Sequence, residues 1–372
     1  MIASMSKVQQ FARDRFPELL DALKTSGYRC IGPQIRDGAI LYDTLDSFDQ
    51  LPKGQQDHQS PGEYRITEIS SPRNFSWANG PQALKPYLFA PHEVLWKANI
   101  DANKDITFSE AGLDVPPLAV IGVRACDLAA LGLQDAHFIG RPDPDPYYAK
   151  RREQLFLVAV NCTHPADTCF CVSTGDGPQA TAGYDLVLSE LDDCFLIEAG
   201  SERGEAILAM ISTSDAVPEA IAIAATENEA AANRQTRSLP SRNLRDQLFA
   251  NLEHPRWNDV AERCLSCGNC TSVCPTCFCY SENEQPSLQG NESNHIREWD
   301  SCFTHGHSYV HGFVVRPDTG TRYRQWLTHK LGSWHDQFGR SGCVGCGRCI
   351  SWCPVGIDIT EEASAVCMEP EK

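Results

Sequence analysis

Two runs of cysteines in this sequence share the same spacing. Residues 263–279 read RCLSCGNCTSVCPTCFC, and the pattern CxxCxxCxxxCP returns near the other end as CVGCGRCISWCP. Thiolates spaced in this way bind iron-sulfur cubanes. The pattern therefore predicts two [4Fe-4S] clusters, held by the eight cysteines Cys264, Cys267, Cys270, Cys274, Cys343, Cys346, Cys349 and Cys353.

In such runs the first three cysteines bind one cubane, and the fourth, which is turned away before a proline, binds the other. We assign the first cluster to Cys264, Cys267, Cys270 and Cys353, and the second to Cys343, Cys346, Cys349 and Cys274. This exchange requires the two runs to pack against each other.

Two other metal chemistries compete with this assignment. Structural zinc also uses four cysteines, but it commonly takes them as separated CxxC pairs rather than as two quartets with a trailing proline. Cys270, Cys274 and Cys277 also spell CxxxCxxC, the arrangement of radical S-adenosylmethionine enzymes. That site would take two cysteines out of the ferredoxin run, so the iron-sulfur interpretation is preferred.

Further thiols lie outside the two runs. Cys277, Cys279 and Cys302 are in the segment between them, and they are either additional ligands or buried free cysteines, of which we prefer the second. The nearby His305, His307 and His311 could bind metal but are better explained as surface residues or contacts to the clusters. A separate set near the N-terminus consists of Cys126, Cys162, Cys169 and Cys171.

Short apolar segments are expected to position this N-terminal set. LAVIGV (118–123), LFLVAV (155–160) and YDLVLSEL (184–191) are strand candidates, and a stretch with helical potential separates the first two. Adjacent parallel strands would bring their C-terminal ends together, and the four thiols follow two such ends. From the residues alone, a third cluster site and a set of buried cysteines both remain open.

The remainder of the chain indicates two domains. An Ala- and Glu-rich stretch before residue 242 fits a helix and a linker, and Leu244, Leu248, Phe249 and Leu252 recur at helical spacing. We expect an α/β N-terminal domain over residues 1–240. A mostly helical dicluster ferredoxin-like C-terminal domain over 241–372, with an insertion at 275–342, follows it.

Composition narrows the possible functions. The formal net charge is -17, with 49 Asp and Glu against 32 Lys and Arg, which disfavours a nucleic-acid role. The sequence shows no secretory signal and no run of about 18 apolar residues, so we expect a cytoplasmic protein with no membrane partner. Motifs such as GxGxxG, GxxxxGKS, GxSxG and HExxH are not found, and no catalytic residue is assigned.

Several longer motifs resemble one family. They are QSPGEYR, RACDLAAL, DPYYAKRRE, NCTHPADTCFC, GYDLVLSEL, CPTCFC, WDSCF and CVGCGRCISWCPVGIDI, and together they span nearly the whole chain. The combination resembles the beta subunit of cytosolic NiFe sulfhydrogenases, a family that includes the electron-transfer subunit of the anaerobic sulfite reductase. RACDLAAL and TCFCVSTGDGP are more specific to it than the ferredoxin runs.

The resemblance implies an iron-sulfur subunit that relays single electrons between a flavin subunit using NAD(P)H and a NiFe hydrogenase catalytic subunit. In the other branch the catalytic partner would be a sulfite reductase. The resemblance also favours a third [4Fe-4S] cluster at Cys126, Cys162, Cys169 and Cys171. A competing hypothesis makes the chain itself a reductase of sulfur compounds, with Cys277, Cys279 and Cys302 as its site.

Overall fold

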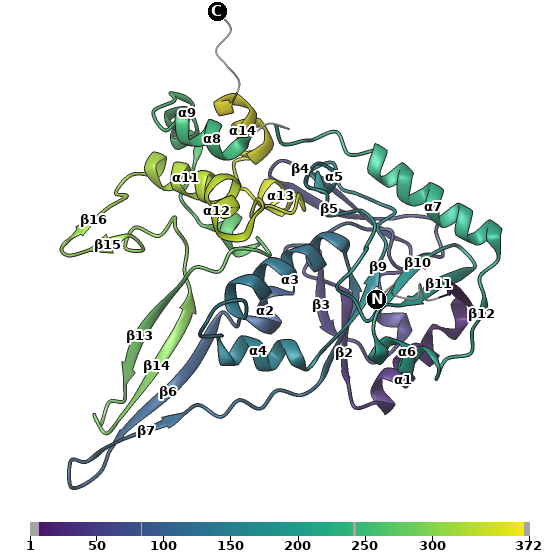
Figure 1. Cartoon of the computed structure of the whole chain (residues 1–372), viewed down its shortest axis with the longest axis horizontal. Coiled ribbons are helices and arrows are strands. Elements are labelled where there is room, and N and C mark those ends of the chain that lie inside the picture. Colours follow the sequence, from purple (N-terminus) through teal and green to yellow (C-terminus); the bar gives the residue numbers. More distant parts are fainter. Residues whose placement is uncertain (1–6, 83, 241–242, 368–372) are drawn as a thin grey trace, which may run out of the picture.

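The computed structural model describes residues 7–82, 84–240 and 243–367. An eight-stranded sheet forms the N-terminal part, in the order β12-β1-β11-β10-β9-β8-β2-β3 (Figure 1). Its four central strands are parallel, and the strands at both sides pair antiparallel. The strands are β1 (Gln9–Ala12), β2 (Arg29–Arg36), β3 (Ala39–Thr44), β8 (Leu118–Val123), β9 (Leu155–Val160), β10 (Leu186–Glu190), β11 (Cys194–Ala199) and β12 (Ser214–Asp215).

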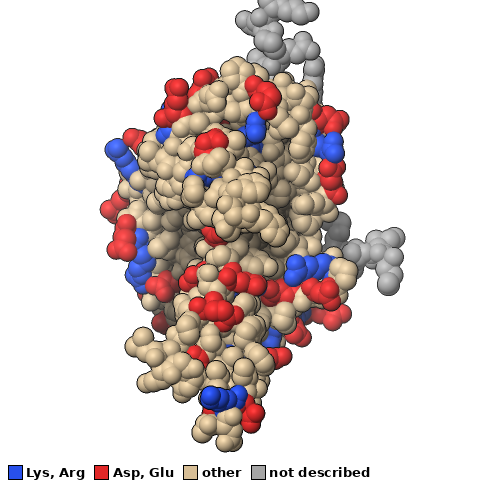
Figure 2. Space-filling view, turned by 90° about the vertical axis from the view of Figure 1, so that its left-hand side faces the viewer, with Lys and Arg blue, Asp and Glu red and all other residues tan. Residues whose placement is uncertain are grey.

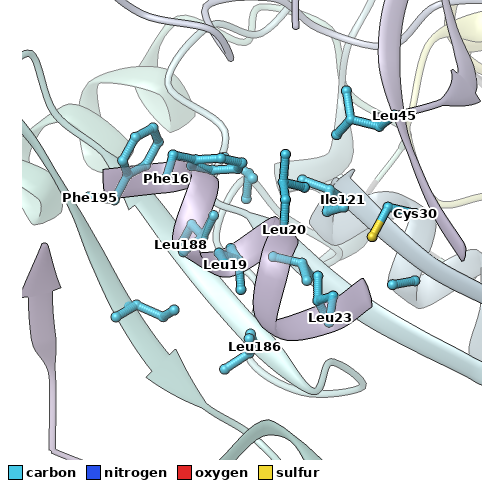
Figure 3. Close-up of a cluster of buried hydrophobic side chains, with 14 of the residues drawn as sticks. Phe16, Leu19, Leu20, Leu23, Cys30, Leu45, Ile121, Leu186, Leu188 and Phe195 are labelled. Carbon is cyan, nitrogen blue, oxygen red and sulfur yellow. The ribbon is translucent and has the colours of Figure 1, made fainter. Parts of the chain in front are cut away.

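Strands β8 and β9 are apolar and buried throughout because helices cover both faces of the sheet. Alternate residues of β8 and β9 point into two hydrophobic cores, one on each face of the sheet. On one face Ile121 meets α1 (Phe16–Thr25), as Figure 3 shows, and on the other Val120 lies in the core of α3 (Ala125–Phe138) and α4 (Pro146–Glu153). The three expected strands are confirmed, and β9 pairs in parallel with both β8 and β10.

The C-terminal part is largely helical, as expected. Its core joins Leu248, Val260, Leu327 and Val366 from helices that lie together at the top of Figure 1. These elements are α8 (Leu244–Ala250), α9 (Arg256–Arg263), α10 (Asn269–Ser272), α11 (Thr319–Thr328), η3 (His329–Ser333), α12 (Trp334–Phe338), α13 (Arg348–Ser351) and α14 (Ile359–Cys367). The helix expected near Leu244 is therefore present.

One sheet joins the two parts of the chain. Strands β13 (Tyr280–Pro286) and β14 (Glu292–Trp299) pair with β6 (His92–Ile100) and β7 (Ile106–Glu110) in a four-stranded antiparallel arm that projects from the molecule (Figure 1). β6 belongs to the expected N-terminal domain and β14 to the expected C-terminal domain, so their pairing joins the two domains. Residue 241, at the expected boundary, lies outside the described residues. The insertion at 275–342 thus contributes strands as well as helices.

The remaining elements are short or peripheral. They are η1 (Arg13–Arg15), η2 (Phe48–Gln50), β4 (Gln55–Ser60), β5 (Glu63–Glu68), α2 (Lys85–Leu88), α5 (Cys171–Thr174), α6 (Glu202–Leu208), α7 (Pro218–Asn233), β15 (Tyr309–Val310) and β16 (Phe313–Val314). None of the helices among the described residues is long and apolar enough to span a bilayer. On the face in Figure 2 acidic side chains are distributed over the surface, several of them beside a hollow near its middle.

Candidate iron-sulfur sites

The two ferredoxin runs fold into matching loops. Each places one cysteine on a short helix, Cys270 on α10 and Cys349 on α13, and these two helices pack together. A glycine precedes each helix in the left-handed region, Gly268 at φ +76 and Gly347 at φ +73, where a side chain would be strained. The loops therefore turn sharply enough to present several thiols to one point.

The structure brings together the four thiols assigned to the first cluster. Burial raises the pKa of Cys270, and the neighbouring Cys264, Cys353 and Cys267 raise it further. Cys264 in turn lies near Cys353 and Cys267. These thiols line a cavity whose other walls are mainly apolar, among them Phe303, Tyr323, Trp326, Ile357 and Ile359. The set therefore offers four sulfur ligands around a cavity with mainly apolar walls that reaches the surface at Cys267.

The thiols assigned to the second cluster are also neighbours. Burial raises the pKa of Cys343 to about 12, and Cys346 and Cys274 add to the increase. Cys349 lies near Cys343, Cys346 and Cys274, and all four are half-buried. The fourth cysteine of each run thus stands beside the first three of the other run.

This donor set fits an iron-sulfur cluster. Burial and mutual repulsion disfavour the charged form of most of these thiols, so a bound cationic centre is needed to hold them as thiolates. Within the described ranges no group of three or more His, Cys, Asp and Glu side chains is arranged to hold a single metal ion.

Hydrogen bonds from the protein reach several of these sulfurs. The backbone N–H groups of Ser266, Gly345 and Ile357 donate to sulfur over distances of 3.3–3.4 Å. Their acceptors are Cys264, Cys343 and Cys353 respectively. Such bonds stabilise thiolate charge and tune the potential of a bound cluster.

A buried lysine lies beside the second site. Lys330 Nζ is 3.6 Å from Cys274 Sγ and donates to Thr276 Oγ1 at 2.7 Å. Burial by itself lowers the pKa of Lys330, but the neighbouring sulfurs of Cys274 and Cys277 outweigh it and the pKa is raised. The side chain therefore carries a positive charge against the sulfur ligands.

The N-terminal cysteines also converge. Cys126 lies in the first turn of α3, just after β8, and Cys162 follows β9, so the parallel pairing of these strands brings both to one edge of the sheet. Cys171 lies near Cys162 and Cys126, and Cys169 lies near Cys171 and Cys162. Burial is the first cause of the raised pKa of each of the four.

Two amide side chains donate to this third set. Asn79 Nδ2 is 3.2 Å from Cys126 Sγ, and Gln235 Nε2 is 3.3 Å from Cys171 Sγ. An amide donor stabilises a ligating thiolate without adding charge. The four thiols and two donors are therefore consistent with a cluster site in the N-terminal part.

The third set packs directly on the second ferredoxin loop. Phe170 N donates to Gly345 O at 2.8 Å, and a Cβ added to Gly347 would lie 2.4 Å from Thr168 O. Arg348 of the same loop makes a two-point ion pair with Asp127 of α3, with Nη–Oδ distances of 2.7 and 3.0 Å, and both side chains are 1% exposed. The second and third sets are thus held against each other.

Sequence reasoning missed the side chains that support these sites. Lys330, Arg348, Asn79 and Gln235 reach the sulfurs or their neighbours only through tertiary packing, and no local spacing singles them out. The three histidines were expected to be surface residues or contacts to the clusters, and His305 and His311 are indeed exposed. His307 instead pairs with Asp300 and contacts Cys279.

Comparison with known proteins supports the iron-sulfur assignment. Residues 263–357 match the 4Fe-4S dicluster domain family. The chain is also 31% identical over 346 residues to the beta subunit of sulfhydrogenase 2 from Pyrococcus furiosus, an alignment that covers 92% of this chain and 93% of that protein. No solved structure matches the chain.

Proposed function

The chain belongs to the family of sulfhydrogenase beta subunits, and from this premise we propose that it carries single electrons through three [4Fe-4S] clusters within a hydrogenase-type complex. The family and the dicluster domain support the iron-sulfur role. Beyond this role, we propose the number of clusters, their ligands and the partner subunits. The ligands are the three cysteine quartets described above.

The continuity of the three quartets carries this proposal. Cys270 of the first set lies near Cys274 of the second, and Cys346 of the second lies near Cys126, Cys169 and Cys171 of the third. Cys267 of the first set is exposed at the surface. The quartets therefore form an uninterrupted series from the surface of the helical part to the edge of the N-terminal sheet.

A [4Fe-4S] cluster accepts and releases one electron when bound, with a potential set by charge, hydrogen bonds and solvent exposure. The chain supplies these influences itself. The buried aromatic side chains of Tyr323 and Trp326 shield one side of the first site from water, and Lys330 offsets negative charge at the second. Arg348 and Asp127 fix the distance between the second and third sites.

The proposed partners follow from the family. A flavin subunit that takes hydride from NAD(P)H supplies electrons in pairs, and clusters that carry one electron each pass them on stepwise. We place a NiFe hydrogenase catalytic subunit at the other end of the route. A sulfite reductase catalytic subunit is the alternative partner.

The test uses the complex purified anaerobically through a tag on this chain. Nickel in the complex would identify the hydrogenase partner, whereas sirohaem absorbance would identify the sulfite reductase. NAD(P)H-driven turnover of the catalytic subunit should be lost in Cys346→Ser and kept in Cys194→Ser, a half-buried cysteine outside the three sets. EPR would show whether the other clusters survive. Unchanged turnover in Cys346→Ser with the second cluster missing would refute the route.

A further inference from the structure

A pair of cysteines outside the three quartets is brought together by the β13–β14 hairpin. Cys279 directly precedes β13 and Cys302 follows β14 by three residues. The hairpin register pairs Tyr280 with Trp299, and Asp300 N donates to Cys279 O at 3.0 Å. The base of the arm therefore holds the two cysteines opposite each other.

Cys279 and Cys302 share a hydrogen bond, and a histidine supports it from the other side. The His307 side chain hydrogen-bonds to Cys279, and His307 Nδ1 lies 2.5 Å from Asp300 Oδ2. The contact with Cys302 is the main cause that lowers the pKa of Cys279 to about 4, while the same contact raises the pKa of Cys302. The pair is therefore one thiolate and one thiol that share a proton.

The pair lies beside the first cluster site, and the neighbouring Cys277 connects it to the second. Cys279 lines a cavity together with Cys267, a ligand assigned to the first cluster, and Cys302 lies near Cys270. Cys277, which also lines this cavity, hydrogen-bonds to Cys274 of the second set. Cys279 and Cys302 are free cysteines outside the three quartets.

We propose that Cys279 and Cys302 form a reversible dithiol–disulfide couple that exchanges electrons with the neighbouring clusters. On oxidation the Cys279 thiolate and the Cys302 thiol form one S–S bond and release two electrons and one proton. The electrons pass singly to oxidised [4Fe-4S] clusters, and the proton leaves to solvent through the adjoining cavity. Reduction reverses each step.

This couple would store an electron pair beside carriers that take one electron each. Attack by a thiolate is the chemistry by which disulfides form and break, and a histidine beside the sulfur keeps it in that state. The Asp300–His307 pair therefore acts as a positioning group for Cys279. The inference rests on the proposed function, because the clusters are its electron partners.

The experiment maps thiols in the intact complex. Samples are poised anaerobically with dithionite or with mild oxidising dyes, quenched in acid, alkylated, digested and analysed by mass spectrometry, with iron measured in parallel. We expect a Cys279–Cys302 cross-link in oxidised samples and two alkylated thiols in reduced ones, at unchanged iron content. Coulometric reduction should take about two electrons per chain more in the wild type than in Cys302→Ser. Cys367→Ser, another half-buried thiol beside the same helical core, is the matched control.

Each other outcome overturns the inference. Thiols that stay alkylatable at every potential at which the clusters titrate would refute the couple and leave the proposed function intact. A cross-link that persists after the clusters are reduced would refute their exchange of electrons. Loss of about four irons in Cys302→Ser would make Cys302 a cluster ligand. A wild-type complex without reducible clusters would overturn the proposed function as well.

Discussion

Replacing Lys330 with methionine should lower the midpoint potential of the second cluster. The Lys330 side chain is 3% exposed and its Nζ lies 3.6 Å from Cys274 Sγ. Its positive charge favours the addition of an electron to a cluster bound there. Methionine keeps a similar length without the charge, so reduction of the cluster becomes less favourable.

The size of the shift follows from Coulomb's law. An added electron is spread over the cluster, so its effective separation from Nζ exceeds the sulfur distance and is about 6 Å. At an effective dielectric constant of about 20, the lost attraction is about 3 kcal/mol. For a one-electron couple this corresponds to a fall of about 130 mV, since a tenfold change in the equilibrium constant is about 59 mV.

EPR-monitored redox titration of the anaerobic protein measures this shift directly. Lys330→Arg is the control, because it keeps a positive charge at the same place, and its second-cluster potential should stay within about 30 mV of the wild type. Iron content shows whether each variant keeps its clusters. A methionine variant with full iron content and an unchanged or raised potential would refute the electrostatic role of Lys330.

Three further predictions concern the packing around the sites. Gly347→Ala should lower the free energy of unfolding by about 2 kcal/mol or more and reduce iron retention. Gly339→Ala is the control: Gly339 has φ +72 but open space around it, so its substitution should lower the free energy of unfolding by about 1 kcal/mol. Chemical denaturation compares the two variants. Arg348→Met should destabilise by about 3–5 kcal/mol in the same assay by leaving Asp127 buried without its partner, and addition of Asp127→Asn should recover part of the loss. Burial lowers the pKa of His137 from 6.5 to about 4, so the stability that the neutral ring contributes above pH 6.5 is lost as the pH falls toward 4. The melting temperature of the wild type should therefore drop more steeply over this range than that of His137→Gln. Equal slopes for the two proteins would contradict the assignment.

The parallel strands and the cysteine groupings could be anticipated from the sequence. LAVIGV and LFLVAV are continuous apolar runs, which is typical of strands covered on both faces, and the following cysteines then fall at one sheet edge. The spacing of the two ferredoxin runs predicts that each run gives its fourth cysteine to the other cluster. The structure places Cys274 beside Cys343 and Cys353 beside Cys264, as this prediction requires. Iron ligation itself stays a prediction.

The arm and the supporting side chains could not be anticipated. Strand β14, with the sequence ESNHIREW, is largely polar and only part buried, so it has no strong strand pattern, and its partner β6 is about 200 residues away in the chain. Lys330 lies 56 residues from Cys274, and Arg348 lies 221 residues from Asp127. Contacts at such separations depend on the complete fold rather than on local spacing.

The most direct test of the three-cluster route is the amount of iron and acid-labile sulfide per chain in anaerobically purified protein, combined with EPR after dithionite reduction. Three [4Fe-4S] clusters predict about twelve irons and twelve sulfides per chain, with interacting signals from neighbouring clusters. Cys126→Ser should then lower the iron content by about four without disturbing the other two clusters. About eight irons in the wild type would confine the clusters to the ferredoxin runs and contradict the continuous route through the N-terminal quartet.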